Sequence, residues 1–532
     1  MELPGMFSNP LGWVHAQVMG GWKRCLQLGL GYGGFALLLI VIMIRSAINE
    51  GVTPTSACQV VLSILMALQA GMMFMFISAG VRRAVQKDFT SGMIESHRQS
   101  PISGWSAVLG YLTGPCTQIA GITAANLLLA LLLNVYGGMG MGGWLLWVMG
   151  LLVALIPAYA IASLLLMMAL STKGSATAMG MVIFLLAFGG ANLMWLVPGL
   201  GIMTGVYSVT DMVQSASRGR FKFDPMIGFA LAAQLGIIAI ACAASARRFV
   251  SDARRAFTWE LGVCLTVLLA IGGFVGLRIY ATRYQQEWGL AGMNVPFDVQ
   301  WLATLVAILL GCVIPISAAV WHRVGWLRRK AVDPEWRHPA PRSVGWVLLL
   351  IVIFVSVIGG WSLGIPLYDL SPEWRSFCGR IHMDNAERSS MALALVTAVT
   401  TGLALLPIAG LLRMIFGFRD RFGGILLFWI ALAWGVPFLV EALSMAYSAK
   451  TRPMDSWFMG CSPIGWWALL LNEPKSSLWG GLAVQAVLAA VVGILLPGWV
   501  GSRQIRSYQR KVEKADAAPA AAAIAAPAAP AP

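Results

Sequence analysis

The chain has 532 residues, of which 58% are hydrophobic and only 11% are charged, and its formal net charge is +15. Soluble globular proteins carry about 25% charged residues, so this composition excludes a soluble enzyme, and the hydrophobic content excludes a disordered protein. The eight cysteines form no Cys-x-x-Cys pair and the five histidines stand singly, so the sequence predicts no metal site.

Residues 1–27 are predicted to hold an amphipathic helix that lies on the cytoplasmic surface of a membrane. Asn9 is a candidate N-cap residue, and Pro10 occupies the first helical position, where its missing amide proton is not needed. Tryptophan and the basic pair Lys23-Arg24 suit the lipid headgroup layer. The expected apolar stripe recurs at steps of three and four residues and consists of Leu11, Val14, Val18 and Trp22.

Twelve apolar segments are long enough to cross a membrane, because a spanning helix needs about 20 mostly apolar residues. They predict an all-α polytopic membrane protein with about twelve transmembrane helices. The segments are 28–44, 56–80, 106–135, 144–170, 177–197, 226–245, 260–280, 300–321, 344–364, 389–412, 423–446 and 477–500.

The basic residues predict the orientation of these helices, since Lys and Arg accumulate in cytoplasmic connections. With both termini in the cytoplasm, 25 of the 37 Lys and Arg residues fall on the inner side, and the outer side is neutral. The positive charge is therefore interpreted as a topology signal, and no nucleic-acid partner is predicted. The expected location is the cell membrane, inner or cytoplasmic, with the lipid bilayer as an obligate partner.

The chain reads as two parallel six-helix repeats, 28–255 and 256–514, followed by an Ala/Pro-rich tail, 515–532, that is predicted to be disordered. A long basic cytoplasmic loop follows the second helix of each half. The two loops close on related patterns, His97…Pro101…Gly104-Trp105 and His338…Pro341…Gly345-Trp346.

The first of these loops, 81–105, contains a short stretch that favours a helix and that Pro101 would end. Three apolar residues are expected to share one side of it, Phe89, Met93 and Ile94, with charged residues opposite. A short amphipathic helix of this kind is suited to docking against another protein.

The loop places Asp88 four residues before Gly92, Glu95 three residues after it, and Ser100-Pro101 at its end. With this arrangement it resembles the first cytoplasmic loop of the membrane-spanning permeases of ABC transporters, type-2 exporter class. Their loop reads acid-x-x-x-Gly-Thr-Leu-Glu-Leu-Leu-x-x-(Ser/Thr)-Pro-Leu-Ser. The chain departs from this pattern at Met93, Ser96 and His97. The Asn9-Pro10 opening and the six helices in each half are also similar to the family. The matching residues are Asp88, Gly92, Ile94, Glu95, Ser100, Pro101, Ile102 and Ser103.

The resemblance implies that ATP is hydrolysed by separate ABC ATPase subunits, in two copies, and that the short loop helix couples them to the membrane helices. This chain has no Gly-x-x-x-x-Gly-Lys-Ser/Thr motif, so no cofactor is expected to bind to it. The second-half loop lacks the Gly-x-x-Glu core, and Glu335 and Trp336 are its candidate contacts. The contacts implied for the first loop are Asp88, Phe89, Gly92, Met93, Ile94, Glu95 and Pro101.

Few polar residues interrupt the predicted spans. Glu441 and Asn192 are candidates for an intramembrane polar site, because polar groups at membrane depth are often functional. Amides such as Gln69 and Asn126 are expected to form hydrogen bonds between helices.

The sequence thus predicts the non-enzymatic membrane subunit of an ATP-driven exporter of an amphiphilic or apolar substrate. Three alternatives remain open: an ion-coupled secondary transporter, a membrane enzyme, and a non-catalytic subunit of a membrane complex. The sparse intramembrane charge disfavours the ion-coupled transporter. Loop 366–388 holds acidic residues and a histidine, but no spacing that defines a metal or acid/base pair, which disfavours an enzyme.

Overall fold

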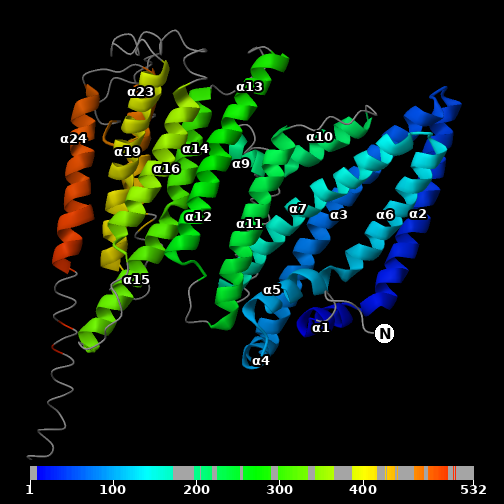
Figure 1. The fold of residues 1–532 in the computed structure, drawn as a ribbon, viewed down its shortest axis with the longest axis horizontal. Coiled ribbons are helices and arrows are strands. Elements are labelled where there is room, and N and C mark those ends of the chain that lie inside the picture. Colours follow the sequence, from blue (N-terminus) through cyan, green and yellow to red (C-terminus); the bar gives the residue numbers. More distant parts are fainter. Residues whose placement is uncertain are drawn as a thin grey trace, which may run out of the picture. The chain divides into compact units, whose positions relative to one another are not determined.

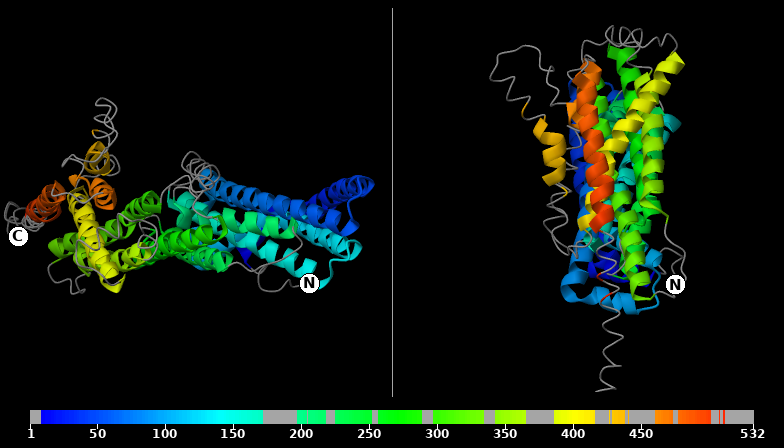
Figure 2. Two further views of the ribbon diagram at one scale, coloured as in Figure 1. Left: turned by 90° about the horizontal axis from the view of Figure 1, so that it is seen from above. Right: turned by 90° about the vertical axis from the view of Figure 1, so that its left-hand side faces the viewer.

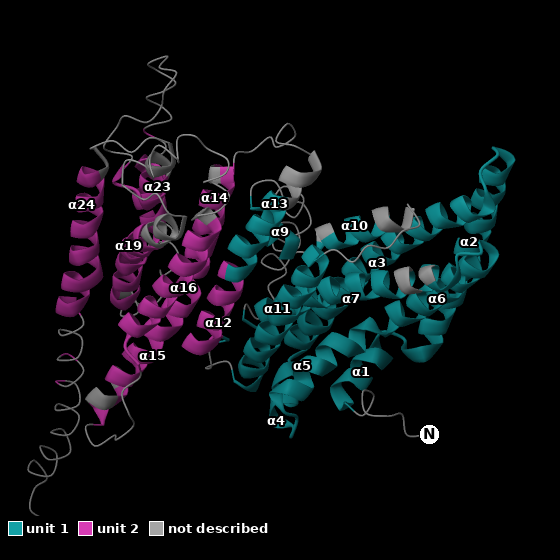
Figure 3. Ribbon diagram, turned by 45° about the horizontal axis from the view of Figure 1, so that its top comes forward, with its two compact units in different colours: residues 1–256, 271–295 teal, residues 257–270, 296–532 magenta. Residues whose placement is uncertain are grey.

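The computed structural model describes residues 9–171, 197–203, 205–217, 225–251, 256–288, 297–333, 342–364, 386–415, 426, 428–437, 440, 460–472, 477–500, 507 and 510. These residues form helices and connecting turns, with no strand among them. Their contacts divide the chain into two compact units, Met1–Ala256 with Ile271–Val295, and Phe257–Ala270 with Pro296–Pro532 (Figure 3). The parallel repeat predicted from the sequence stays a prediction.

Unit 1 is built from long helices and from shorter ones. Its elements are α1 (Pro10–Val18), α2 (Gly21–Asn49), α3 (Pro54–Ser91), α4 (Met93–Gln99), α5 (Gly104–Thr113), η1 (Gly114–Cys116), α6 (Thr117–Tyr136), α7 (Gly140–Ser171), α9 (Pro198–Met203), α10 (Val206–Ser217), α11 (Pro225–Val250), η2 (Ile271–Val275) and α13 (Gly276–Trp288). The shorter helices α1, α4 and α5 gather at one end of this unit (Figure 1).

Unit 2 contains long helices that run along roughly one common direction within the unit (Figures 1 and 2). The indole of Trp301 on α14 donates to the Ser362 hydroxyl of α16 at 3.0 Å and packs on Trp467 of α23. The elements of this unit are α12 (Trp259–Ala270), α14 (Phe297–Gly311), α15 (Val313–Val332), α16 (Val344–Gly364), α19 (Ala386–Ile415), η4 (Ala431–Gly435), α23 (Pro463–Asn472), α24 (Ser477–Ala490) and η5 (Val491–Leu495).

Ten helices in the described part of the chain are long and apolar enough to cross a membrane. Each overlaps one of the predicted spans, with α5, η1 and α6 together forming the span Gly104–Tyr136. The predicted span 177–197 lies almost wholly outside the described residues, and half of 423–446 lies outside them. The prediction of a multi-pass helical membrane protein is therefore confirmed, and the total of twelve spans stays a prediction.

The core of unit 1 joins α3 to α5, α6, α7 and α11 and also takes in Leu11 of α1 and Ile94 of α4. Small residues bring the helix pairs together. A Cβ atom on Gly121 of α6 would lie 2.2 Å from the backbone oxygen of Cys25 on α2, and one on Gly114 would lie 2.5 Å from the backbone oxygen of Gly12 on α1. Glycine at these positions thus permits the backbones of α2 and α6, and of α1 and η1, to touch.

Candidate functional site

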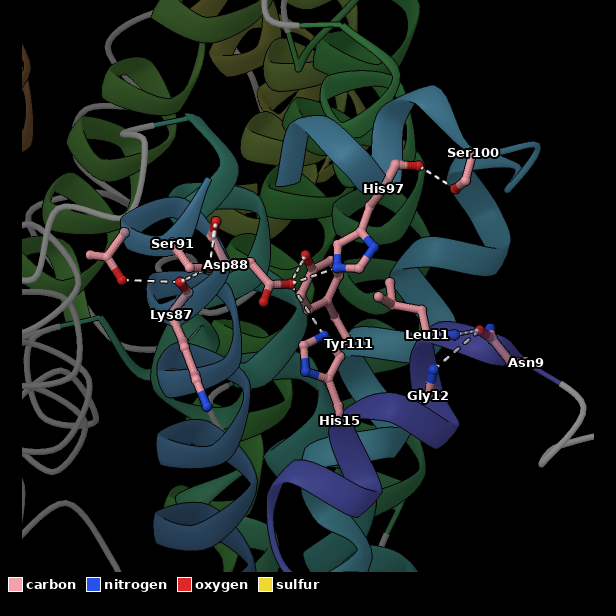
Figure 4. Close-up of polar contacts among 11 residues, drawn as sticks. Asn9, Leu11, Gly12, His15, Lys87, Asp88, Ser91, His97, Ser100 and Tyr111 are labelled. Carbon is pink, nitrogen blue, oxygen red and sulfur yellow. Dashed lines mark hydrogen bonds and ion pairs between the residues drawn. The ribbon is translucent and has the colours of Figure 1, made fainter. Parts of the chain in front are cut away.

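The predicted loop helix forms α4, and a left-handed glycine sets the turn into it. Gly92 has φ 73° and ψ 0°, a conformation that few residues other than glycine adopt without strain. A Cβ atom there would meet no other atom within 4 Å, so the backbone conformation alone requires glycine. After the last turn the hydroxyl of Ser100 donates to the backbone oxygen of His97 at 2.6 Å, and the helix ends before Pro101, as predicted (Figure 4).

The apolar residues of this loop do not share one side, contrary to the prediction. Phe89 lies in the last turn of α3 and packs against the core of unit 1, and Ile94 is fully buried in that core. Met93 is 45% exposed, and Glu95 is exposed beside it. Because successive residues of a helix are about 100° apart, Met93 and Ile94 point in different directions. Ile94 anchors α4, whereas Met93 and Glu95 remain accessible.

Asp88, near the end of α3, is buried at the meeting point of four helices. The hydroxyl of Tyr111 on α5 donates to its Oδ2 at 2.6 Å. His15 Nε2 of α1 and His97 Nε2 of α4 lie 3.3 Å and 3.4 Å from the same oxygen (Figure 4). Asp88 is only 6% exposed, so this carboxylate contacts its own chain and joins α1, α3, α4 and α5.

This cluster has the composition that a buried carboxylate requires. A carboxylate removed from water is destabilised unless hydrogen-bond donors or cations compensate for the lost hydration. Tyr111 donates the hydrogen bond, and the two imidazoles lie within ion-pair distance, each on a different helix. Removing any one of them is therefore expected to weaken the attachment of its helix to α3. Among the described residues, no group of three or more His, Cys, Asp or Glu side chains is arranged to hold a metal ion.

Arg98 fastens α4 to the end of α11. Its Nε donates to the backbone oxygen of Phe249 at 2.8 Å, and one of its terminal nitrogens lies 2.8 Å from Glu95 Oε1. Arg248 in turn donates from Nε to the backbone oxygen of Leu170, in the last turn of α7, at 3.2 Å. The last carbonyl groups of a helix lack intrahelical partners and carry partial negative charge, so arginine is well suited to these positions.

The structure of α1 confirms the predicted N-cap residue and corrects the predicted apolar stripe. The side-chain oxygen of Asn9 accepts hydrogen bonds from the amides of Leu11 and Gly12, so Asn9 is the N-cap (Figure 4). The helix ends at Val18, and Gly20 then adopts φ 104°, which breaks the predicted stripe before Trp22. The buried side of the helix consists of Leu11, Gly12, His15 and Ala16.

The polar amides inside the spans form the predicted hydrogen bonds between helices. The side-chain amide of Gln69 on α3 donates to the Thr123 hydroxyl of α6 at 2.8 Å, and the amide of Asn126 on α6 donates to Gln69. The remaining candidates, Asn192, Glu335, Trp336 and Glu441, lie outside the described residues.

Four residues around Asp88 and α4 were not singled out from the sequence as functional: His15, His97, Tyr111 and Arg98. His15 stands one turn after Leu11, and this i, i+4 spacing signals a shared face. The partners of Tyr111 and Arg98 are 23 and 151 residues away along the chain, so periodicity carries no signal for them.

No protein-family model matches this chain, and neither a curated protein nor a solved structure is significantly similar to it.

Proposed function

We propose that this chain is the membrane-spanning permease subunit of an ATP-driven exporter, with α4 as the helix that docks on a separate ATPase subunit. One observation carries the proposal: α4 is held from inside at several points while one side of it stays exposed. Ile94 is in the core, His97 contacts Asp88, and Arg98 binds the end of α11. Met93 and Glu95 are left for a partner.

This attachment suits a helix that must transmit force. A displacement of α4 would be passed to α3 through the short turn at Gly92 and the His97–Asp88 contact. It would be passed to α11 through Arg98, and from there to the end of α7 through Arg248. Helices α3, α7 and α11 each include a candidate membrane span. Movement at the exposed side of α4 would therefore reach the helices that would enclose the proposed transport path.

The rest of the proposal rests on the sequence. Two ATPase copies would contact the chain, one at α4 and one at the segment after α15, where Glu335 and Trp336 are the proposed contacts. ATP would bind only to the partner. The cargo is proposed to be amphiphilic or apolar, because the spans contain few charged residues, and the location is proposed to be the inner or cytoplasmic membrane.

The test is site-specific photocrosslinking in cells. A benzoylphenylalanine introduced at Met93 should capture a protein whose sequence contains the Gly-x-x-x-x-Gly-Lys-Ser/Thr motif. The matched control carries the same group at Leu128 of α6, which is 63% exposed on a membrane helix and should capture no such protein. The charge reversal Glu95→Lys should reduce capture at position 93. If position 93 and position 128 capture the same proteins, none with that motif, the proposal is wrong.

A second candidate, a proton-coupled transporter, is favoured by one observation. Asp88 and His15 are buried and lie beside the partly exposed His97, and sets of a carboxylate and histidines of this kind relay protons in pumps and transporters. This function requires substrate-dependent proton movement in vesicles without ATP, and Asp88→Asn should abolish it. An exporter driven by a separate ATPase requires ATP instead, so the two functions are separated by which energy source drives transport.

A further inference from the structure

A cavity of about 360 Å³ with mostly apolar walls lies within unit 1. Small-molecule sites in proteins typically measure about 300–1,000 Å³ and have such walls. Three long helices each present a row of side chains spaced one turn apart, so the cavity is elongated along the helices. The rows are Met73 and Ile77 of α3, Ala120 and Ala124 of α6, and Leu151 and Leu155 of α7.

The open space comes from small residues on α6. Ala120 and Ala124 are both exposed, and both line the cavity. One turn further along the same side of this helix, Leu128 is exposed without lining the cavity. One polar atom of the wall is unused: the hydroxyl of Thr117, at the start of α6, is buried and has no hydrogen-bond partner among the described residues. The cavity walls are thus mostly apolar but carry the hydroxyl groups of Thr113, Thr117, Thr123 and Tyr159, and Thr117 marks the end of the cavity where α6 begins.

That end lies at the level of the turn between α1 and α2. The side-chain amide of Gln118, next to Thr117, donates to the backbone oxygen of Met19 in this turn. Trp22 lines the cavity and is also 45% exposed, so it stands at an edge of the cavity rather than in its interior. Tryptophan at such a position is typical of the boundary between hydrocarbon and headgroups.

The protein segment beside this edge of the cavity is positively charged. Lys23 and Arg24 follow Trp22 directly, and both are exposed. No Asp or Glu occurs between residues 3 and 49, so no acidic side chain from this part of the sequence offsets them. A cationic rim of this kind attracts anionic lipid headgroups.

We propose that this cavity holds one acyl chain of an anionic phospholipid from the surrounding bilayer. The acyl chain lies between the rows of α3, α6 and α7, and the phosphate is bound by Lys23 and Arg24. The proposal rests on the cavity and its rim and does not depend on the proposed transport function.

The site also has a structural connection to the Asp88 cluster. Gly12 and Ala16 of α1 line the cavity, one turn apart. Leu11 and His15, the residues directly before them, face the core and Asp88. A lipid chain against Gly12 and Ala16 therefore supports the helix that delivers His15 to Asp88, and losing it should loosen α1.

The experiment uses the full chain in phosphatidylcholine vesicles that contain a trace of phosphatidylglycerol with a photoreactive diazirine in one acyl chain. After irradiation, peptide mass spectrometry should find label on the segments 113–127 and 73–77. A phosphatidylcholine probe with the same diazirine should label these segments less. Ala124→Trp fills the cavity and should abolish this label, while Leu128→Trp, one turn further along the same helix and outside the cavity lining, should keep it.

Two further measurements separate loss of lipid binding from loss of folding in the labelling experiment. The thermal midpoints of the two tryptophan variants show whether each is folded. The double variant Lys23→Gln, Arg24→Gln leaves the cavity unchanged and should reduce labelling by the phosphatidylglycerol probe to that by the phosphatidylcholine probe. The proposal is overturned if folded Ala124→Trp is labelled like the unaltered protein, or if the two probes label the unaltered protein equally.

Discussion

Arg98 and Phe249 are 151 residues apart in the chain, yet the Arg98 Nε donates a 2.8 Å hydrogen bond to the backbone oxygen of Phe249. This bond connects the short helix α4 to the last turn of α11. The arginine side chain is only 8% exposed, so water cannot readily replace the carbonyl as its partner. The position of α4 therefore depends on a contact that neither of its flanking helices provides.

Arg98→Ala should lower the free energy of unfolding by about 1.5–3 kcal/mol, the usual contribution of a hydrogen bond to a charged group. Arg98→Lys keeps the charge but lacks the planar guanidinium, so its effect should be smaller and still measurable. Chemical denaturation in detergent micelles provides the values. Arg83→Ala, on the exposed side of α3, is the control and should change little. Equal effects at positions 83 and 98 would contradict the role given to Arg98.

The contact between Asp88 and Tyr111 should show strong coupling in a double-mutant cycle. Tyr111→Phe removes one donor, whereas Asp88→Ala leaves the Tyr111 hydroxyl buried without its acceptor and should be more destabilising. The double variant should lose less than the sum of the two single losses. Denaturation of the four proteins measures this difference. Losses that add to within about 0.5 kcal/mol would mean that the two side chains act independently.

The crossing of α2 and α6 gives a prediction that depends on sterics alone. Gly121→Ala would place a Cβ atom 2.2 Å from the Cys25 backbone oxygen, so the helices must separate, at a cost of about 1–3 kcal/mol. Gly31→Ala, on α2, meets no atom within 4 Å and should stabilise slightly because alanine favours helix by about 1 kcal/mol over glycine. We expect the thermal midpoint to fall for Gly121→Ala and to rise for Gly31→Ala, relative to the unaltered protein. A Gly121→Ala protein as stable as the unaltered one would show that the two backbones do not touch.

Local features of this fold were predictable, and long-range ones were not. The Asn9 cap and the apolar spans follow from short-range rules, because a cap needs residues two and three positions away and a span needs only continuous apolarity. The predicted stripe through Trp22 failed because Gly20 interrupts the helix, and glycine has too many allowed conformations for the break to be foreseen.

The candidate site was predictable only in part, because its contacts join residues that are distant in the sequence. The resemblance pointed to Asp88, Gly92 and Glu95 together, and it treated all of them as contacts with a partner. The structure buries Asp88, because residues from α1 and α5 close over it. Which side of a short loop helix faces its own chain depends on helices distant in sequence. In this case the buried side is the one that carries Ile94 and His97.

The turn at Gly92 permits a test that separates backbone conformation from packing. Because its φ is 73° and no atom lies within 4 Å of a Cβ atom built there, Gly92→Ala should destabilise only through the left-handed conformation, by about 1–2 kcal/mol. Gly92→Asn should be milder, since asparagine tolerates this conformation better. Gly71→Ala, in the middle of α3 and also without neighbours, is the control and should not destabilise.

Under the proposed function, Gly92→Ala should also reduce capture of the ATPase by a photocrosslinker at position 93, because α4 would leave its position, whereas Gly71→Ala should not. If Gly92→Ala matches Gly71→Ala in both stability and capture, the left-handed turn does not position α4.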